Sequence, residues 1–239
     1  WYVKMLDKWE PSAKYSRLFL EIPAAGQQAK VFVNGEFVVS HEGGYSAFRA
    51  DITEKCTEEF NTIAIWCSNE KCDAIYPQSA DFTFYGGLYR GAHLICVPET
   101  HFELLHYGVL GIHAATEPAS WDKEDFMLHI RTKICGVEKD NQVIYQIFDE
   151  DGKEVASAAR PADSPDTSIP LYKPHRWDIK NSYQYTLKAL IMRNNECLDE
   201  VELKFGVRTF CCDPGRGFLI NGNCVPLRGV SRHQDKLYQ

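Results

Sequence analysis

The chain has 239 residues, of which 44% are hydrophobic and 25% are charged. This is the composition of a soluble globular protein, with room for one large domain or two ordinary ones. The formal net charge is −7 and no long basic block is present, which argues against nucleic acid as a partner because phosphate binding needs a positive surface. No apolar run is long enough to span a bilayer. Since the chain opens at Trp1 rather than Met, a missing leader sequence carries little weight.

Alternating hydrophobic and polar residues dominate the first hundred positions, where helical periodicity is hard to find. Residues 14–22, 61–67 and 88–97 are each predicted to form a strand. The strongest hairpin signal lies at 30–39, where β-branched and aromatic flanks surround Asn34-Gly35. Asn-Gly accepts the positive φ values of a type I′ turn, so the pair predicts a tight connection between two strands.

A second series of short strands is predicted after a seam near 98–101. Its strands are expected at 126–134, 142–148, 153–158, 183–192 and 200–205, with a turn at 150–152. Residues 160–168 are rich in Pro, Ser and Asp and predict a surface loop. Many short strands separated by turns about every ten residues predict β-sandwiches.

Nine cysteines are present, an odd number with irregular spacing. Cys67 and Cys72 have the spacing most like that of a metal-binding pair, but they are too far apart in sequence and no second cysteine pair accompanies them. Reduced, mostly buried thiols in a cytoplasmic protein are the expected state.

Four stretches of sequence together suggest a family. The first runs from Asn34-Gly35 through HEGGYSAF at 41–48 to Asp51-Ile52-Thr53, and the second is DFTFYGGLYR at 81–90. The third is FGVRT at 205–209, and the fourth is LRGVSRHQD at 227–235. In this order, over essentially the whole chain, they resemble glycoside hydrolase family 2, the β-galactosidase family. One departure is Gly91-Ala92, where the family usually has an acidic residue; it puts a local surface contact in doubt and not the fold.

The resemblance implies an all-β chain in which a jelly-roll, galactose-binding-like β-sandwich is followed by an immunoglobulin-like β-sandwich. The domains are expected at 1–99, as a jelly roll trimmed at its N-terminus, and at 100–209. Residues 210–239 are then a lead-in to a missing (β/α)₈ catalytic barrel, and an Asn221-Gly222 turn stands early in this segment. The run Arg232-His233-Gln234-Asp235, in place of a Lys-His-Glu variant, favours β-galactosidases over β-glucuronidases.

By resemblance, Asp81 reaches from the first domain into the neighbouring active site, where it contacts sugar hydroxyls and, in some members, a sodium ion. A carboxylate can accept hydrogen bonds from two adjacent hydroxyls. The alternative is a turn aspartate that caps the loop before Gly86-Gly87. His233 is likewise implied to line the sugar site, with a domain-junction histidine bonded to backbone groups as the alternative. Arg232 and Asp235 are expected to support the strand end through ion pairs.

No catalytic residue is expected in this chain. Retaining glycosidases use two carboxylates about 5 Å apart, and the resemblance places both as glutamates on strands of the missing barrel, which takes about 250 residues. The expected partners are a β-galactoside sugar and the chain's own C-terminal barrel, with no nucleic acid and no membrane, and a homo-oligomer is left open. No cofactor is expected in this portion, while sodium or magnesium could belong to the full-length enzyme. A bacterial, cytoplasmic location is expected.

Two alternatives remain open. The sugar could be a glucuronide or a mannoside in an enzyme of the same family. In a different class, the chain could be a stand-alone carbohydrate-binding module, which would need an exposed aromatic platform. Four aromatic residues could each stack on a sugar ring, but each is expected to pack in the core: Trp66, Trp121, Trp177 and Tyr45.

Overall fold

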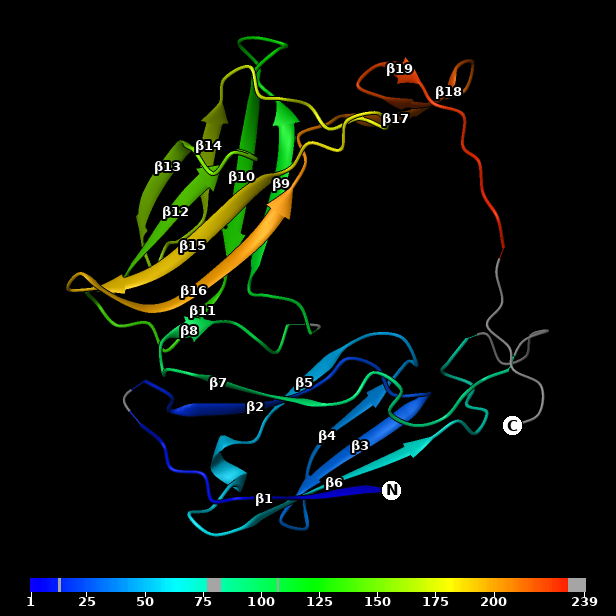
Figure 1. Ribbon diagram of the computed structural model, residues 1–239, viewed down its shortest axis with the longest axis vertical. Coiled ribbons are helices and arrows are strands. Elements are labelled where there is room, and N and C mark those ends of the chain that lie inside the picture. The colour runs from blue at the N-terminus through cyan, green and yellow to red at the C-terminus, as the bar shows by residue number, and fades with distance from the viewer. Residues whose placement is uncertain (13, 77–82, 107, 232–239) are drawn as a thin grey trace. The chain divides into compact units, whose positions relative to one another are not determined.

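The computed structural model describes residues 1–12, 14–76, 83–106 and 108–231 (Figure 1). Within these ranges the chain is built from antiparallel β-strands, with a single short 3₁₀ turn at Thr53–Lys55. The chain divides into two compact units. Trp1–Glu99 and Leu104–Val109 belong to the first, and Thr100–Glu103 and Leu110–Val230 form the second. The prediction of an all-β chain made of two successive sandwiches is confirmed.

The first unit has two sheets, with strand orders β1-β6-β3-β4 and β5-β2-β7 (Figure 1). The strands are β1 (Tyr2–Leu6), β2 (Arg17–Ile22), β3 (Gln28–Val33), β4 (Glu36–Glu42), β5 (Phe48–Asp51), β6 (Asn61–Ser68) and β7 (His93–Val97). Alternate residues of both sheets point inward and form one core, in which Ile22, Val31 and Ile52 are completely buried. Burying side chains of this size contributes about 1.5–3 kcal/mol each.

The predicted hairpin joins β3 to β4. Asn34 and Gly35 have φ values of 51° and 84°, as a type I′ turn requires. The Asn34 side chain also ties the turn to β6, because its Oδ1 accepts the Thr62 N–H at 2.9 Å and its Nδ2 donates to Asn61 Oδ1 at 2.8 Å. The Asn-Gly pair therefore fixes both a turn and a neighbouring strand.

Asp51-Ile52-Thr53 forms a structural corner after β5. Asp51 Oδ1 accepts hydrogen bonds from the Thr53 N–H at 3.0 Å and from Thr53 Oγ1 at 2.6 Å. Asp51 also pairs with Arg17, and the Leu18 N–H donates to Thr53 Oγ1 at 2.9 Å. The motif thus holds the start of β2 against the end of β5.

The second unit contains two principal sheets, β14-β10-β9 and β13-β12-β15-β16, and two smaller ones, β11-β8 and β17-β18-β19. The strands are β8 (His101–Phe102), β9 (Ile112–Pro118), β10 (Phe126–Thr132), β11 (Ile134–Cys135), β12 (Gln142–Phe148), β13 (Glu154–Pro161), β14 (Thr167–Leu171), β15 (Tyr185–Arg193), β16 (Glu196–Phe205), β17 (Phe210–Asp213), β18 (Gly217–Ile220) and β19 (Asn223–Cys224). The core lies between the principal sheets, where Leu128, Ile147 and Leu187 are fully buried.

The motif at 205–209 closes this sandwich around Trp177. Val207 is fully buried, and its carbonyl accepts the Trp177 N–H at 2.9 Å. A Cβ on Gly206 would lie 3.0 Å from Trp177 Cβ, so the residue must be small. Arg208 places its guanidinium 4.6 Å from the Trp177 ring centroid, a cation–π contact. The motif at 205–209 therefore packs the sandwich around Trp177.

Several expectations about the fold need correction. No strand was predicted at the positions of β1, β5, β9, β14 or β17–β19, and the strand expected at 88–97 is present only at His93–Val97. The nine cysteines are all free thiols, but the expectation that most are buried is wrong. None is buried and five are exposed, because most of them lie on the outward side of a strand or in loops.

Tyr145 is fully buried in the core of the second unit and carries a hydroxyl there. Its oxygen lies 2.7 Å from Thr132 Oγ1 and donates to the Pro165 carbonyl at 2.9 Å. Burial raises the pKa of Tyr145 to about 12, so the group stays a neutral donor. Its two partners come from β10 and from the loop before β14, which the hydroxyl therefore joins to β12.

Replacing Tyr145 with Phe should lower the free energy of unfolding by about 1–3 kcal/mol, because two buried polar partners are left without the hydroxyl. Urea unfolding followed by circular dichroism measures the change. Tyr172 is 72% exposed, and Tyr172→Phe should stay within about 0.5 kcal/mol of the wild type. Equal effects of the two substitutions would contradict the role given to the buried hydroxyl.

Candidate functional site

The four residues that the sequence singled out are not among those that the structure describes. Asp81 falls in 77–82, and Arg232, His233 and Asp235 fall in 232–239. Their roles at a sugar site, including the sodium contact of Asp81, stay predictions. Tyr76 and Phe84, which lie on either side of Asp81 in the sequence, line a groove.

The groove belongs to the first unit and has a volume of about 190 Å³. We call it the tyrosine groove. It is lined by Gln27, Gly43, Gly44, Tyr45, Ser46, Ile75, Tyr76 and Phe84. Asp81 lies between Tyr76 and Phe84 in the sequence. Two of the motifs that carry the family resemblance, at 41–48 and 81–90, therefore contribute to one feature.

A close approach of two glycines holds the groove's loops together. Gly26 and Gly87 exchange two backbone hydrogen bonds of 3.0 Å each. A Cβ on Gly26 would collide with the Tyr85 carbonyl oxygen, and one on Gly87 with the Tyr2 hydroxyl. Gly87 also has a φ of 86°, which favours glycine. Gly26 is therefore required by the backbone packed against it, and Gly87 by its positive φ.

Tyr89 and Arg90 attach the second motif to the first. The Tyr89 hydroxyl donates to the Gly44 carbonyl, and Arg90 Nη1 donates to the Tyr45 carbonyl at 3.3 Å. On the other side, the Gly43 N–H donates to the Gln27 carbonyl at 2.9 Å. The loop at 43–46 is thus bonded on both sides, and its side chains are presented from a fixed backbone.

His41 lies beneath this loop. Its ring stacks on Phe48 with centroids 4.3 Å apart, and its Nε2 lies 3.1 Å from Ser46 Oγ. Burial lowers the pKa of His41, and the hydrogen bond of its ring to the Gly43 backbone opposes that shift. A neutral imidazole that orients Ser46 is the state that fits these contacts.

Two aromatic side chains at the groove are exposed. Tyr45 is 63% exposed and Tyr76 is 79% exposed, so core packing is the wrong expectation for Tyr45. It is also wrong for Trp121, which is 56% exposed and donates from Nε1 to Asp125 at 2.8 Å. Trp66 is half-buried with Lys30 over its ring. Tyr76 was missed because isolated aromatics in a loop give no periodic signal.

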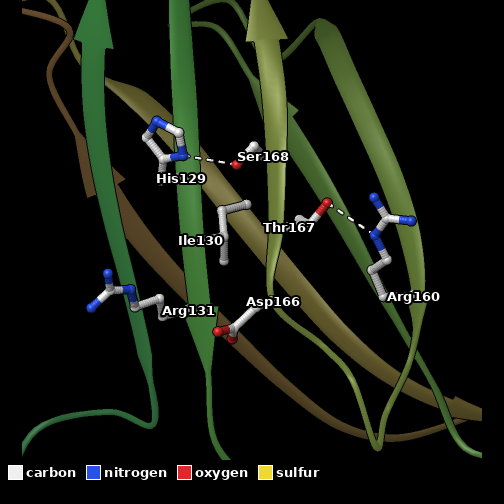
Figure 2. A pocket seen from close by; sticks show the side chains of 7 residues that line it. All are labelled: His129, Ile130, Arg131, Arg160, Asp166, Thr167 and Ser168. Carbon is white, nitrogen blue, oxygen red and sulfur yellow. Dashed lines mark hydrogen bonds between the residues drawn. The ribbon is translucent and has the colours of Figure 1, made fainter.

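A second groove, of about 470 Å³, lies in the second unit beside β10 and β14 (Figure 2). Arg131 and Arg160 contribute its positive charge, and Figure 2 shows the two guanidinium groups on opposite sides of the groove. Arg160 donates from Nε to Thr167 Oγ1 at 3.1 Å, and Asp166 accepts the Thr132 N–H at 2.9 Å. Because the two cations do not converge, the groove makes a poor clamp for a single anion.

His129 joins two polar neighbours on the same sheet face. Its Nδ1 lies 2.7 Å from Ser168 Oγ (Figure 2), and its Nε2 lies 2.9 Å from Glu117 Oε1. The three residues come from three adjacent strands of an exposed sheet. A Ser-His-acid line of this kind also occurs in hydrolases, but here it lies on an open surface that does not exclude water. We interpret it as a cross-strand surface network.

Among the described residues, no group of three or more His, Cys, Asp or Glu side chains is arranged to hold a metal ion. Those residues also include no helix with the length and apolar character needed to cross a membrane. We take the tyrosine groove as the candidate functional site because residues of two motifs that carry the family resemblance line it.

Comparison with known proteins gives the family. The sequence model for glycosyl hydrolases family 2 matches residues 118–208. The structure of an FMN-binding β-glucuronidase from Facaelibacterium prausnitzii L2-6 is 43% identical to this chain with a TM-score of 0.92, and the match covers 98% of this chain and 36% of that one. This chain belongs to glycosyl hydrolase family 2.

Curated family 2 relatives match over almost all of the chain. A β-glucuronidase of Bacteroides fragilis is 30% identical, with 95% of this chain and 34% of the relative covered. A β-galactosidase of Thermoanaerobacter pseudethanolicus is 29% identical, with 98% of this chain and 31% of the relative covered. The chain spans about a third of the length of these relatives.

Gly26→Ala should lower the free energy of unfolding by about 1–3 kcal/mol, because the added methyl meets backbone that cannot move without breaking the bonds to Gly87. Hydrogen exchange of the Gly87 amide should accelerate in the variant. Gly229 has open space around it, so Gly229→Ala should change stability by at most about 0.5 kcal/mol. An unchanged exchange rate in Gly26→Ala would show that the two-glycine contact does not hold the loops.

His41 should make stability depend on pH. Since its pKa is lowered in the folded state, unfolding is accompanied by proton uptake once the pH falls below about 6.5, the pKa of an unperturbed histidine. The stabilising preference for neutral imidazole is fully present above that pH and is lost as the pH falls through it. His41→Gln should flatten the dependence between pH 7.5 and 5, measured by urea unfolding. His113→Gln, at an exposed position of the second unit, should keep the wild-type slope, and a His41 pKa of 6.5 or above by NMR would contradict the prediction.

Proposed function

We propose that this chain is the non-catalytic accessory portion of a family 2 glycosidase that hydrolyses β-linked O-glycosides. The observation that supports this proposal is the share of each relative that the chain matches. The matches cover 95–98% of this chain and only about a third of each relative. A (β/α)₈ barrel of about 250 residues fits within the unmatched part of such proteins. Both catalytic glutamates would then lie outside these 239 residues.

In this proposal the two sandwiches support the barrel and shape its cleft. Asp81 would supply a carboxylate to sugar hydroxyls, and His233 would supply an imidazole, with Arg232 and Asp235 orienting it. The tyrosine groove supports a role for the region around Asp81, because Tyr76 and Phe84, on either side of Asp81 in the sequence, line it. In this proposal the 239 residues position and recognise the substrate, and another part of the protein cleaves the bond.

For the sugar, we put a β-glucuronide first. The solved structure described above, at 43% identity, is a β-glucuronidase, and so is the curated relative at 30%. A β-galactoside, the substrate that the run at 232–235 favours, is the second candidate. The β-galactosidase at 29% identity supports it.

The protein encoded by the complete reading frame should hydrolyse 4-nitrophenyl β-D-glucuronide with a kcat/KM at least about a hundredfold above that for the β-galactoside. A site that hydrogen-bonds a substrate carboxylate rejects analogues without one. Residues 1–239 alone should show no turnover. Asp81→Ala should lower kcat/KM about ten- to a hundredfold, the loss expected for a hydrogen bond to a charged group.

Asp151→Ala, at an exposed turn of the second unit, is the matched control and should leave kcat/KM unchanged. Turnover by residues 1–239 alone would overturn the accessory role. A higher kcat/KM for the galactoside would place the second candidate first. Sugar binding by a protein that hydrolyses no glycoside would favour a carbohydrate-binding module.

A further inference from the structure

Two exposed phenol rings flank the tyrosine groove without a partner in the described part of the chain. Tyr45 and Tyr76 are 63% and 79% exposed. Neither side chain makes a hydrogen bond or ring contact with a described residue. Large aromatic rings are the side chains that gain most from being covered, so two uncovered rings at one groove indicate a surface that receives something.

The backbone that carries these rings is fixed rather than loose. The carbonyls of Gly44 and Tyr45 accept hydrogen bonds from Tyr89 and Arg90. Next to Tyr76, Ile75 is 8% exposed, and its N–H donates to the Cys72 carbonyl at 3.1 Å. Rings presented from a bonded backbone lose little conformational freedom on binding.

The described side chains that line the groove carry no charge. Besides the two tyrosine hydroxyls, its polar groups are the Gln27 amide, which has no hydrogen-bond partner among described residues, and the Ser46 hydroxyl, which faces His41. These groups offer donors and acceptors together, and the remaining lining is aromatic, aliphatic or glycine. Phosphates and carboxylates would find no cation among the described residues that line the groove. A neutral ring with one C–H face and several hydroxyls matches both parts of the lining.

Size limits the ligand further. At about 190 Å³, the groove is smaller than the roughly 300–1,000 Å³ of pockets that take drug-sized ligands. It has room for one ring, and further sugars of a glycan would lie outside it. A charged glucuronosyl group is a poor fit for the uncharged lining, whereas the neutral sugar attached to it is a good one.

We propose that the tyrosine groove binds one neutral pyranose ring, the leaving-group sugar of the substrate, by stacking on Tyr45 and Tyr76 and hydrogen bonding to Gln27 and Ser46. This inference rests on the proposed glycosidase function, and it adds that the preferred substrate is a disaccharide or longer glycan. Nothing in the groove cleaves a bond. It raises affinity for substrates whose leaving group is a sugar.

The test uses the full-length protein and two substrates that share the β-glucuronosyl group, methyl β-D-glucuronide and a disaccharide in which glucose replaces methanol as the leaving group. Tyr45→Ala and Tyr76→Ala should each raise KM for the disaccharide roughly three- to tenfold, the range expected for one aromatic contact. KM for the methyl glycoside and kcat for both substrates should be unchanged. Tyr76→Phe keeps the ring and should keep the wild-type KM.

Tyr172→Ala removes an equally exposed tyrosine from the second unit and should change neither KM. Equal KM values in wild type and both groove variants would overturn the proposal. So would alanine variants with a lower unfolding temperature and unchanged KM, because that result would show that the rings pack against another part of the protein.

A binding measurement keeps this inference separate from the proposed function. Saturation-transfer NMR with methyl β-D-glucopyranoside as the probe should show transfer to the ring C–H protons, reduced severalfold in the Tyr45→Ala/Tyr76→Ala variant. If the protein hydrolyses no β-glycoside but this transfer is seen and lost with the rings, the proposed function fails and the groove's role stands. If hydrolysis occurs while transfer and KM are unaffected by the rings, the groove's role fails and the function stands.

Discussion

The backbone contact between Gly26 and Gly87 is the constraint on which the first unit's functional surface depends. Two hydrogen bonds of 3.0 Å join the turn before β3 to the segment before β7. Neither residue could carry a side chain without collision. Once this contact is made, Tyr89 and Arg90 fall within reach of the carbonyls at 44 and 45. The GGLYR and GGY sequences are therefore two halves of one hydrogen-bonded assembly.

The motifs that carry the family resemblance serve different physical ends. Asp51-Ile52-Thr53 ties β5 to β2 through the Asp51 carboxylate and the Thr53 hydroxyl. Phe205–Arg208 packs and caps Trp177. These two motifs account for stability, and their side chains are turned toward the protein. The motifs at 41–48 and 81–90 differ, because they leave tyrosine rings in solvent.

How much of the fold the sequence predicts depends on local chemistry. Asn34-Gly35 specified its turn because few residue pairs accept two consecutive positive φ values. β10 and β12 were predicted because large apolar or aromatic residues that are buried recur at every second position along each strand. β1 was missed because most of its residues are exposed, so no inward face marks it. β14 includes Pro170 and follows a loop rich in Pro and Ser, so its composition reads as irregular although Thr167, Ile169 and Leu171 are buried.

The candidate site shows a different limit. Spacing and composition could single out the GGY and GGLYR motifs, but not that the two are hydrogen-bonded to each other, since that contact joins residues about forty-five positions apart. Nor could they show that Tyr45 points into solvent, because an isolated tyrosine in a loop packs inward as readily as outward. A fixed loop with an exposed ring loses the free energy that burial would give, and proteins keep such arrangements where a ligand or partner restores it. The lack of charge among the described lining residues then narrows the choice of ligand, because an uncharged aromatic surface with one amide and three hydroxyls cannot compensate the desolvation of an anion but can replace the water around a neutral sugar.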